Sequence, residues 1–248
     1  MIKKHIKSIG TVIPLGDGAT GKSLITKLLI DDTKELDRAI ELAQSVKKSL
    51  NIELEFCNEV LDFEDKTVST TLQYHVFPGQ RQKISNAAPT FSEIVEIFNF
   101  LPSLKEVKVL LMVYDVTRIE SLKSLESWLA VAMQRQWISN ETKIILVSNK
   151  IDLVSPNQQF IENIQNGIHQ MLTSEGISIN KNQICSKEVS ALSLKGINDL
   201  RKEIFEWSGD ILDTAKKYIG VDKIADEVLK WKLMDLSRYY KETKIRNA

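Results

Sequence analysis

The sequence predicts an α/β fold in which a mostly parallel sheet is flanked by helices. Short apolar runs alternate with amphipathic stretches along the chain, an order typical of parallel strands joined by helical crossovers. With 248 residues, 43% of them hydrophobic and 27% charged, the chain can bury the sizeable core that such a domain needs. The 33 basic and 33 acidic residues cancel, and a net charge of zero argues against nucleic acid as a partner.

Six apolar segments are the predicted strands of this sheet. They are residues 6–15, 54–63, 67–77, 107–114, 143–148 and 186–191. The third segment follows Asp65-Lys66, which we interpret as a hairpin turn, so one strand at the sheet edge is expected to run antiparallel to its neighbour.

Helical periodicity accounts for most of the chain between these strands. The predicted helices are residues 22–29, 121–136, 158–173 and 196–207, with a further charged helix at 31–50. Trp128 lies on the apolar face of the second helix, where we interpret it as a core residue. Beyond Trp207, apolar residues again recur at helical spacing. We therefore predict a main domain at 1–207 and a C-terminal helical extension at 208–248 that packs on the domain or on a partner.

The strongest motif follows the first strand and opens the first helix. Residues 16–23 read Gly-Asp-Gly-Ala-Thr-Gly-Lys-Ser and match the phosphate-binding pattern G-x-x-x-x-G-K-[ST]. Glycines let the backbone wrap closely around phosphates, and successive N–H groups together with the helix N-terminus face the negative charge. The predicted nucleotide-binding residues of this phosphate loop are Asp17, Gly18, Ala19, Thr20, Gly21, Lys22 and Ser23. Lys22 is expected to reach the β- and γ-phosphates in a catalytic role, and the Ser23 hydroxyl is expected to bind Mg²⁺.

A second motif, Asn149-Lys150-Ile151-Asp152, follows the fifth predicted strand and indicates which base is bound. The Asp152 carboxylate can accept hydrogen bonds from N1–H and the 2-amino group of guanine, whereas adenine presents an acceptor and no amino group there. Asn149 is expected to approach N7 and to tie neighbouring loops together, and the Lys150 stem is expected to cover the face of the ring. The two motifs in this order predict a guanine nucleotide site.

Together these motifs resemble the Ras-like small GTPase superfamily. The resemblance covers about residues 6–207 and includes Val189-Ser190-Ala191 and the Tyr-Asp-Val-Thr segment at 114–117. It implies that residues 1–207 form a P-loop NTPase of the G-domain type, with a six-stranded sheet. It also implies that the backbone around Ser190 and Ala191 contacts O6 of guanine. Asp115 and Thr117 are expected to shape the end of their strand rather than to touch the nucleotide.

Residues 77–81, Phe-Pro-Gly-Gln-Arg, stand where the family carries the motif D-x-x-G-Q. The resemblance implies that the N–H of Gly79 senses the γ-phosphate and that Gln80 orients the attacking water. The position of the family's aspartate, which holds Mg²⁺ through water, is occupied by Val76. The Pro-Gly-Gln sequence at this position resembles the corresponding segment of the prokaryotic and archaeal MglA-like GTPases. The segment at 114–122 resembles the corresponding segment of Rab-like GTPases.

The threonine that the family places before its second strand is missing. Counting back from Gly79 by the family's usual interval reaches residues 53–55, which are Glu, Leu and Glu. The basic residues of the preceding charged helix are interpreted as a solvated face, with a cation for the phosphates as the alternative. These residues are Lys34, Arg38, Lys47 and Lys48.

The expected function is that of a small GTPase, which binds GTP or GDP with Mg²⁺, hydrolyses GTP slowly and acts as a molecular switch. Loss of the γ-phosphate is expected to release the loops at 31–50 and 79–103. One alternative is a GTP-binding interaction module with little or no hydrolysis. The other is a P-loop ATPase or kinase, which the guanine-binding role expected for Asp152 argues against.

Partner proteins follow from the resemblance. It implies effectors, an activating protein and an exchange factor, and the similarity to the MglA-like group suggests a Roadblock- or longin-type partner. We expect a cytoplasmic protein without a membrane anchor of its own, because residue 2 is Ile rather than Gly and the last residues carry no cysteine for a lipid.

Overall fold

The structure is a computed structural model that describes residues 4–31, 35–46, 52–62, 66–79, 93, 96 and 107–208. The chain divides into two compact units. The larger unit consists of residues 9–57 and 72–208, and the smaller one of residues 1–8, 58–71 and 209–248. The predicted C-terminal extension lies outside the described residues apart from Ser208, and so does Gln80.

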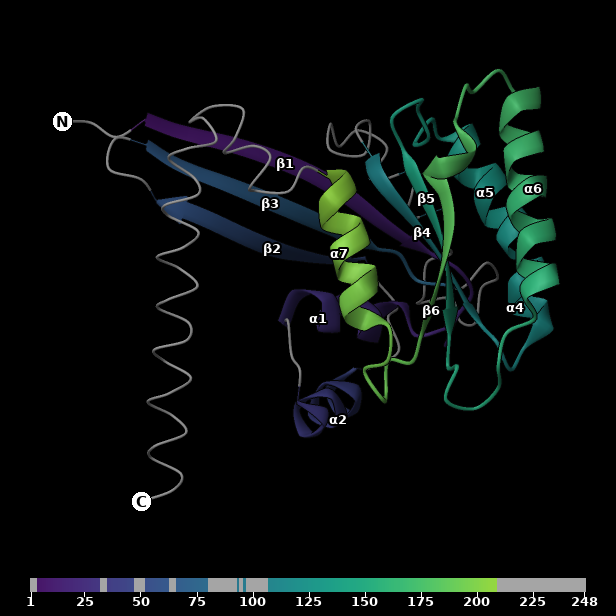
Figure 1. Cartoon of the computed structure of the whole chain (residues 1–248), viewed down its shortest axis with the longest axis horizontal. Coiled ribbons are helices and arrows are strands. Elements are labelled where there is room, and N and C mark those ends of the chain that lie inside the picture. The colour runs from purple at the N-terminus through teal and green to yellow at the C-terminus, as the bar shows by residue number, and fades with distance from the viewer. Residues whose placement is uncertain are drawn as a thin grey trace. The chain divides into compact units, whose positions relative to one another are not determined.

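Six strands form one sheet in the order β2-β3-β1-β4-β5-β6 (Figure 1). Their bounds are β1 Lys4–Leu15, β2 Glu53–Asp62, β3 Lys66–Val76, β4 Val107–Asp115, β5 Lys143–Asn149 and β6 Ile184–Val189. The neighbours β1, β4, β5 and β6 pair in parallel. This mostly parallel α/β sheet confirms the predicted fold class, and each of its strands overlaps a predicted segment.

Strand β2 lies at the edge of the sheet beside β3, as the predicted hairpin requires. Thr67 donates a hydrogen bond to Asp62 across the two strands, and Thr71 donates one to Asn58, both at 2.7 Å. The second pair lies further along β3 but earlier along β2, which is the geometry of antiparallel neighbours. Lys66, which the sequence places in the turn, is the first residue of β3.

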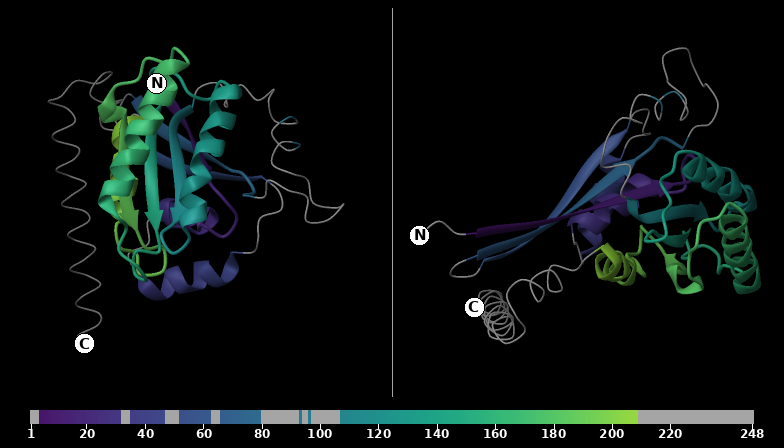
Figure 2. Two further views of the ribbon diagram at one scale, coloured as in Figure 1. Left: turned by 90° about the vertical axis from the view of Figure 1, so that its right-hand side faces the viewer. Right: turned by 90° about the horizontal axis from the view of Figure 1, so that it is seen from above.

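Helices cover both faces of the sheet in the larger unit. One layer contains α1 Lys22–Asp31, α2 Leu36–Ser45 and α7 Ile197–Ser208, and the other contains α4 Ile119–Lys123, α5 Leu125–Gln134 and α6 Gln158–Ser174. In the right-hand view of Figure 2, the yellow-green α7 and the green α6 lie on opposite sides of the strands. A short 3₁₀ helix, η2 Lys181–Gln183, precedes β6.

Strand β4 shows how one segment supplies both layers. Leu110 and Met112 pack into the core beneath α5 and α6, whereas Val109, Leu111 and Val113 pack into the core beneath α1 and α7. Successive side chains of a strand point to opposite faces, so a strand buried on both sides is apolar at every position. This explains the uninterrupted apolar run by which the sequence reveals β4.

The helix predicted at 121–136 is wrong as a single element, because the structure has α4 and α5 separated at Ser124. The Ser124 hydroxyl donates to the carbonyl of Ser121 at 2.9 Å, within the helical turn. Serine hydroxyls compete with the backbone for such carbonyls, which favours helix ends over helix interiors. The helix predicted at 31–50 is described only in part: Asp31 ends α1, and α2 spans Leu36–Ser45.

The last strand begins and ends two residues earlier than predicted, so Ser190 and Ala191 follow β6 rather than belong to it. The Ser190 N–H donates to the carbonyl of Lys195 at 2.9 Å, and the Ala191 N–H donates to the side chain of Asn149 at 3.2 Å. Neither N–H is available to a neighbouring strand, which ends the ladder at Val189. Among the described residues no helix is both long and apolar enough to cross a membrane.

Candidate functional site

The phosphate loop turns sharply between the end of β1 and the start of α1. Gly16, Ala19 and Gly21 have φ values of +140°, +62° and +97°. A Cβ at Gly16 would lie 2.1 Å from the carbonyl oxygen of Val113, and one at Gly21 would lie 2.2 Å from the amide nitrogen of Asn149. The loop therefore needs glycine at these two positions for backbone conformation and for space.

The carbonyls of this loop accept hydrogen bonds from three side chains, those of Lys22, Thr20 and Asn149. Lys22 Nζ donates to the carbonyls of Gly16 and Asp17, both at 2.8 Å, and the Thr20 hydroxyl donates to the carbonyl of Asp17 at 2.9 Å. The Thr20 carbonyl accepts from Asn149 Nδ2 at 2.8 Å. In a trans peptide the N–H points opposite to the carbonyl, so a donor that holds a carbonyl turns the N–H of the next residue to the opposite side. Loop N–H groups next to a helix N-terminus are suited to bind phosphate.

Lys22 is buried in this loop, with 7% of the residue exposed. Burial lowers the pKa of its ammonium group from 10.5 to about 8, and the nearby carboxylates of Asp17 and Glu53 oppose the fall. A desolvated cation interacts strongly with an arriving anion, since little water must be displaced from it. The lysine is therefore preorganised to meet a phosphate group.

Asn149 links three loops of the site, as the sequence predicts. It ends β5 and is almost completely buried. Its amide nitrogen donates to Thr20 of the phosphate loop, and its amide oxygen accepts from the N–H of Ala191 in the loop after β6. Asp152, the predicted guanine-binding carboxylate, is exposed near the same strand end and is accessible to a ligand.

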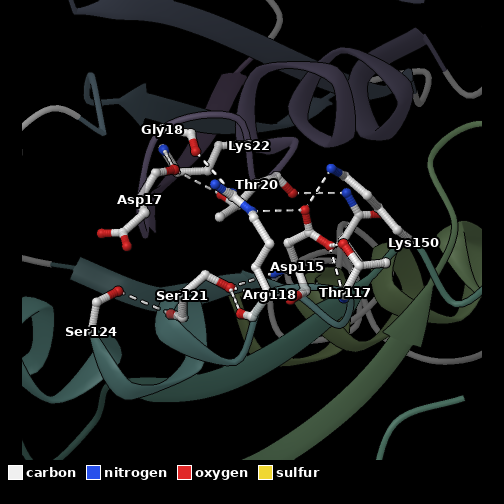
Figure 3. A network of polar contacts seen from close by, with 11 residues as sticks. Asp17, Gly18, Thr20, Lys22, Asp115, Thr117, Arg118, Ser121, Ser124 and Lys150 are labelled. Atoms are coloured by element: carbon white, nitrogen blue, oxygen red, sulfur yellow. Dashed lines mark hydrogen bonds and ion pairs between the residues drawn. The ribbon is translucent and has the colours of Figure 1, made fainter. Parts of the chain in front are cut away.

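A charged network lies at the end of β4, where Figure 3 shows it. Thr117 donates to the Asp115 carboxylate from its backbone N–H at 3.0 Å and from its hydroxyl at 2.6 Å, which confirms that these residues shape the strand end. Lys150 Nζ donates to the same carboxylate at 2.6 Å. The side chain of Arg118 also contacts it, at 3.1 Å, and reaches the carbonyl of Gly18 at 3.0 Å. No pattern in the local sequence predicts these two contacts of Arg118.

The carboxylate of Asp115 is only 1% exposed. Burial acts to raise its pKa, but the hydrogen bonds from Lys150 and Thr117 outweigh this effect and lower the pKa from 3.8 to about 2. The ionised form is therefore stabilised in the folded protein.

We expect Asp115→Asn to lower the free energy of unfolding by about 2 kcal/mol at pH 7, as the fall of the pKa implies. The folded-state pKa lies below the unfolded one, so this contribution is complete above pH 4 and disappears as the pH falls towards 2. Urea denaturation at pH 7 and pH 3, in one nucleotide state, should show the difference from wild type shrinking to roughly half. Asp199→Asn, at an exposed position of α7, is the control; an equal loss there, or a pH-independent difference, would contradict the expectation.

Gly79 lies against the phosphate loop, but through its carbonyl. The Gly18 N–H donates to the Gly79 oxygen at 3.0 Å. A Cβ at Gly79 would lie 2.3 Å from the Gly18 nitrogen, so only glycine permits this approach. The family resemblance instead implies that the N–H group of Gly79 faces the phosphates. Val76, three residues earlier, is fully buried in the core, and its side chain has no atom that could bind a metal ion.

Two tryptophans fix the surroundings of the phosphate loop. Trp128 of α5 is a core residue, as predicted, and its indole N–H also donates to the Asp17 carboxylate at 2.9 Å. Phe77, just before the Pro-Gly-Gln sequence, stacks on Trp137 with ring centroids 5.3 Å apart. The Asp17 side chain is thereby held toward α5, a contact that the motif alone does not reveal.

A magnesium ion would have one protein ligand among the predicted residues, Ser23, which lies in the first turn of α1. No group of three or more His, Cys, Asp or Glu side chains in the described ranges could hold a metal ion. Mg²⁺ commonly keeps several waters and binds through one or two protein groups together with substrate phosphates. The residues present therefore fit an ion that arrives with a nucleotide better than an ion bound by the protein alone.

The charged helix before β2 has one basic residue that the structure describes, and this residue supports the interpretation that the basic side chains form a solvated face. Arg38 of α2 is half exposed and pairs with Asp31 at 2.9 Å and with Glu41 at 3.0 Å. Lys34, Lys47 and Lys48 lie outside the described residues. At the position expected for the missing threonine, β2 begins with Glu53.

Comparison with known proteins gives one family match. Residues 98–208 match the model of the Ras family. No curated protein matches the chain. The matched residues include β4, β5 and β6 with the Asn149–Asp152 loop, and the match supports a GTP-binding domain of the small GTPase type.

Proposed function

We propose, from the premise that the chain belongs to the Ras-like small GTPase superfamily, that it binds GDP and GTP with Mg²⁺ and hydrolyses GTP slowly. We further propose that it acts as a nucleotide-dependent molecular switch. The observation that carries the proposal is the arrangement around Asn149, whose single amide joins the phosphate loop to the loop after β6. One ligand that spans phosphate and guanine sites would contact all three loops.

Each part of the nucleotide has its own residues in this proposal. Lys22 and the N–H groups of the phosphate loop bind the phosphates, Ser23 holds Mg²⁺, and Asp152 recognises the guanine edge. Lys150, held in place by Asp115, covers the ring, while the backbone at Ser190 and Ala191 lies next to O6. Bound Mg²⁺ would neutralise charge that develops on the phosphates during hydrolysis.

The switch would act at Gly79. Its carbonyl occupies the Gly18 N–H of the phosphate loop at 3.0 Å. A γ-phosphate carries negative charge and would repel a carbonyl oxygen but attract an N–H group. GTP would therefore favour rotation of this peptide, and its hydrolysis would allow the carbonyl contact to return. The loop that follows would carry this change to effectors, an activating protein or an exchange factor, and we place these events in the cytoplasm.

Hydrolysis would depend on Gln80, which lies outside the described residues. In the proposal its side chain orients the attacking water, and one GTP and one water yield GDP and inorganic phosphate. Intrinsic turnover is expected at ~10⁻⁴ to 10⁻² s⁻¹, typical of such enzymes without an activating partner.

We expect Gln80→Leu to slow single-turnover GTP hydrolysis by at least about tenfold with little change in GTP affinity, because leucine cannot orient water. Purified full-length protein loaded with radiolabelled GTP and Mg²⁺ is the assay. Equal inertness of both proteins would favour the second candidate, a GTP-binding interaction module, which the buried Val76 and the Glu53 start of β2 support.

Nucleotide binding itself is tested by displacement of a fluorescent GDP analogue. We expect GDP and GTP to displace it and ATP to fail, and EDTA to accelerate its release if Mg²⁺ is held with the nucleotide. Displacement by ATP as effective as that by GTP would favour the P-loop ATPase or kinase alternative and defeat the guanine assignment.

A further inference from the structure

Arg118 connects two loops that are distant in the sequence. It immediately precedes α4, and its guanidinium donates through Nη2 to the Gly18 carbonyl at 3.0 Å and through Nε to Asp115 Oδ2 at 3.1 Å. The same Oδ2 atom accepts from Lys150 Nζ at 2.6 Å. Figure 3 shows the Arg118 side chain extending between Gly18 and Asp115. A continuous chain of charge-assisted hydrogen bonds thus runs from the phosphate loop to the Asn149–Asp152 loop.

The contact with Gly18 fixes the direction of one peptide group. The Gly18 carbonyl and the Ala19 N–H belong to the same peptide, which is trans, so they point in opposite directions. Because Arg118 holds the carbonyl, the Ala19 N–H points away from the guanidinium, and in the proposed function it is this N–H that would meet the phosphates. Ala19 has a φ of +62°, a left-handed conformation that is unfavourable for residues other than glycine. A hydrogen bond to the adjacent carbonyl offsets part of that cost.

The other end of the guanidinium is anchored firmly. Asp115 is buried, and its second carboxylate oxygen accepts from the N–H and the hydroxyl of Thr117. Arg118 itself is 43% exposed, so its position depends on these two acceptors rather than on burial. The guanidinium uses two separate nitrogen atoms for the two acceptors, Nε for Asp115 and Nη2 for Gly18, whereas all the donors of a lysine ammonium lie on one nitrogen atom.

We propose that Arg118 is a positioning residue that holds the phosphate loop in its anion-binding shape and couples that loop, through Asp115, to Lys150. The inference rests on the proposed function, because the coupling matters to binding only if one nucleotide spans both loops. In this proposal Arg118 acts through the peptide that joins Gly18 to Ala19 and does not touch the nucleotide. Its effect should therefore be larger for a ligand that carries a β-phosphate than for one that lacks it.

The test compares GDP with GMP, which lacks the β-phosphate. Affinities of full-length wild type, Arg118→Ala and Arg118→Lys are measured by displacement of a fluorescent GDP analogue. We expect Arg118→Ala to weaken GDP by roughly ten- to a hundredfold, as for a lost charge-assisted hydrogen bond, and Arg118→Lys to be intermediate. The GMP affinity should change by less than about threefold. Lys123→Ala, which removes an exposed positive charge at the end of the same helix, controls for long-range electrostatics.

Each outcome of this test either supports the role proposed for Arg118 or overturns it. Unchanged GDP affinity in Arg118→Ala overturns the proposal, and so does an equal loss for GDP and GMP, since that loss would reflect general damage to the fold. If Arg118→Ala does not fold, Arg118→Lys takes its place, and a wild-type GDP affinity in that variant overturns the proposal. A wild-type protein that binds no guanine nucleotide defeats the proposed function and this inference with it.

A double-mutant cycle isolates the coupling through Asp115. Arg118→Ala and Asp115→Asn are combined, and the GDP affinities of the four proteins are compared. Two residues that act in one chain of hydrogen bonds should give a combined loss at least about threefold smaller than the product of the single losses. Losses that multiply would show that Arg118 acts on Gly18 alone and would overturn the coupling to Lys150.

Discussion

Replacing Lys22 with alanine should abolish most nucleotide binding, with GDP and GTP affinities falling by about a hundredfold or more. Its ammonium is buried and donates to two carbonyls of the loop, so it lies within the loop's own hydrogen-bond network. Truncating one member of a buried charge pair costs about 2–5 kcal/mol, which corresponds to a loss of affinity of about 30- to 4,000-fold, and the burial of Lys22 places it above the low end. Isothermal titration of nucleotide-free protein with GDP measures the effect.

The control for this variant is Lys27→Ala in the same helix, α1, one turn further on. It removes the same charge from a half-buried position outside the phosphate loop. We expect it to retain GDP affinity within about threefold of wild type, as is usual for a partly exposed charge. A Lys22→Ala protein that folds and binds GDP as wild type does would refute the phosphate-loop assignment.

Replacing Asp152 with asparagine should change the preferred base. The carboxylate can accept from both N1–H and the 2-amino group of guanine, whereas the asparagine amide offers one acceptor and a donor that opposes the 2-amino group. Xanthine carries an oxygen in place of that amino group and can accept from the new donor. We expect the GDP affinity to fall by roughly a hundredfold and the affinity for xanthosine diphosphate to exceed it. Competition of both nucleotides against a fluorescent analogue measures the ratio.

Asp152→Ala is the matched control for base recognition. It removes the acceptors without adding a donor, so it should lose GDP affinity and gain none for xanthosine diphosphate. Because Asp152 is exposed, neither substitution should affect folding. A variant Asp152→Asn with unchanged GDP affinity would place the base elsewhere and would leave the phosphate assignment intact.

The phosphate loop can be predicted from the local sequence because its residues are consecutive. The glycines, Lys22 and Ser23 occur within one stretch between a strand and a helix, and the lysine reaches carbonyls only five and six residues away. The apolar runs of β4 and β5 are similarly local signals, since strands buried on both faces need no alternation. These features could be predicted because neighbouring residues alone determine them.

Helix and strand ends were harder to predict, because single side chains decide them. Ser124 separates α4 from α5 by one hydroxyl contact with Ser121, within an apolar pattern that continues across it. The end of β6 depends on the Ala191 N–H, which donates to Asn149 of another loop. Periodicity averages over several residues and does not contain such individual contacts.

The sequence by itself determined the α/β class and the positions of two loops after strands, at 16–23 and at 149–152, all of which depend on short runs of adjacent residues. Only the tertiary structure decided that Arg118 meets Gly18, 100 residues away, and that Trp128 meets Asp17, 111 residues away. The parallel sheet brings the carboxyl ends of β1 and β4 to one edge, where their loops come together. Contacts between residues so far apart in the sequence depend on this pairing of strands, and no pattern in the local sequence specifies them.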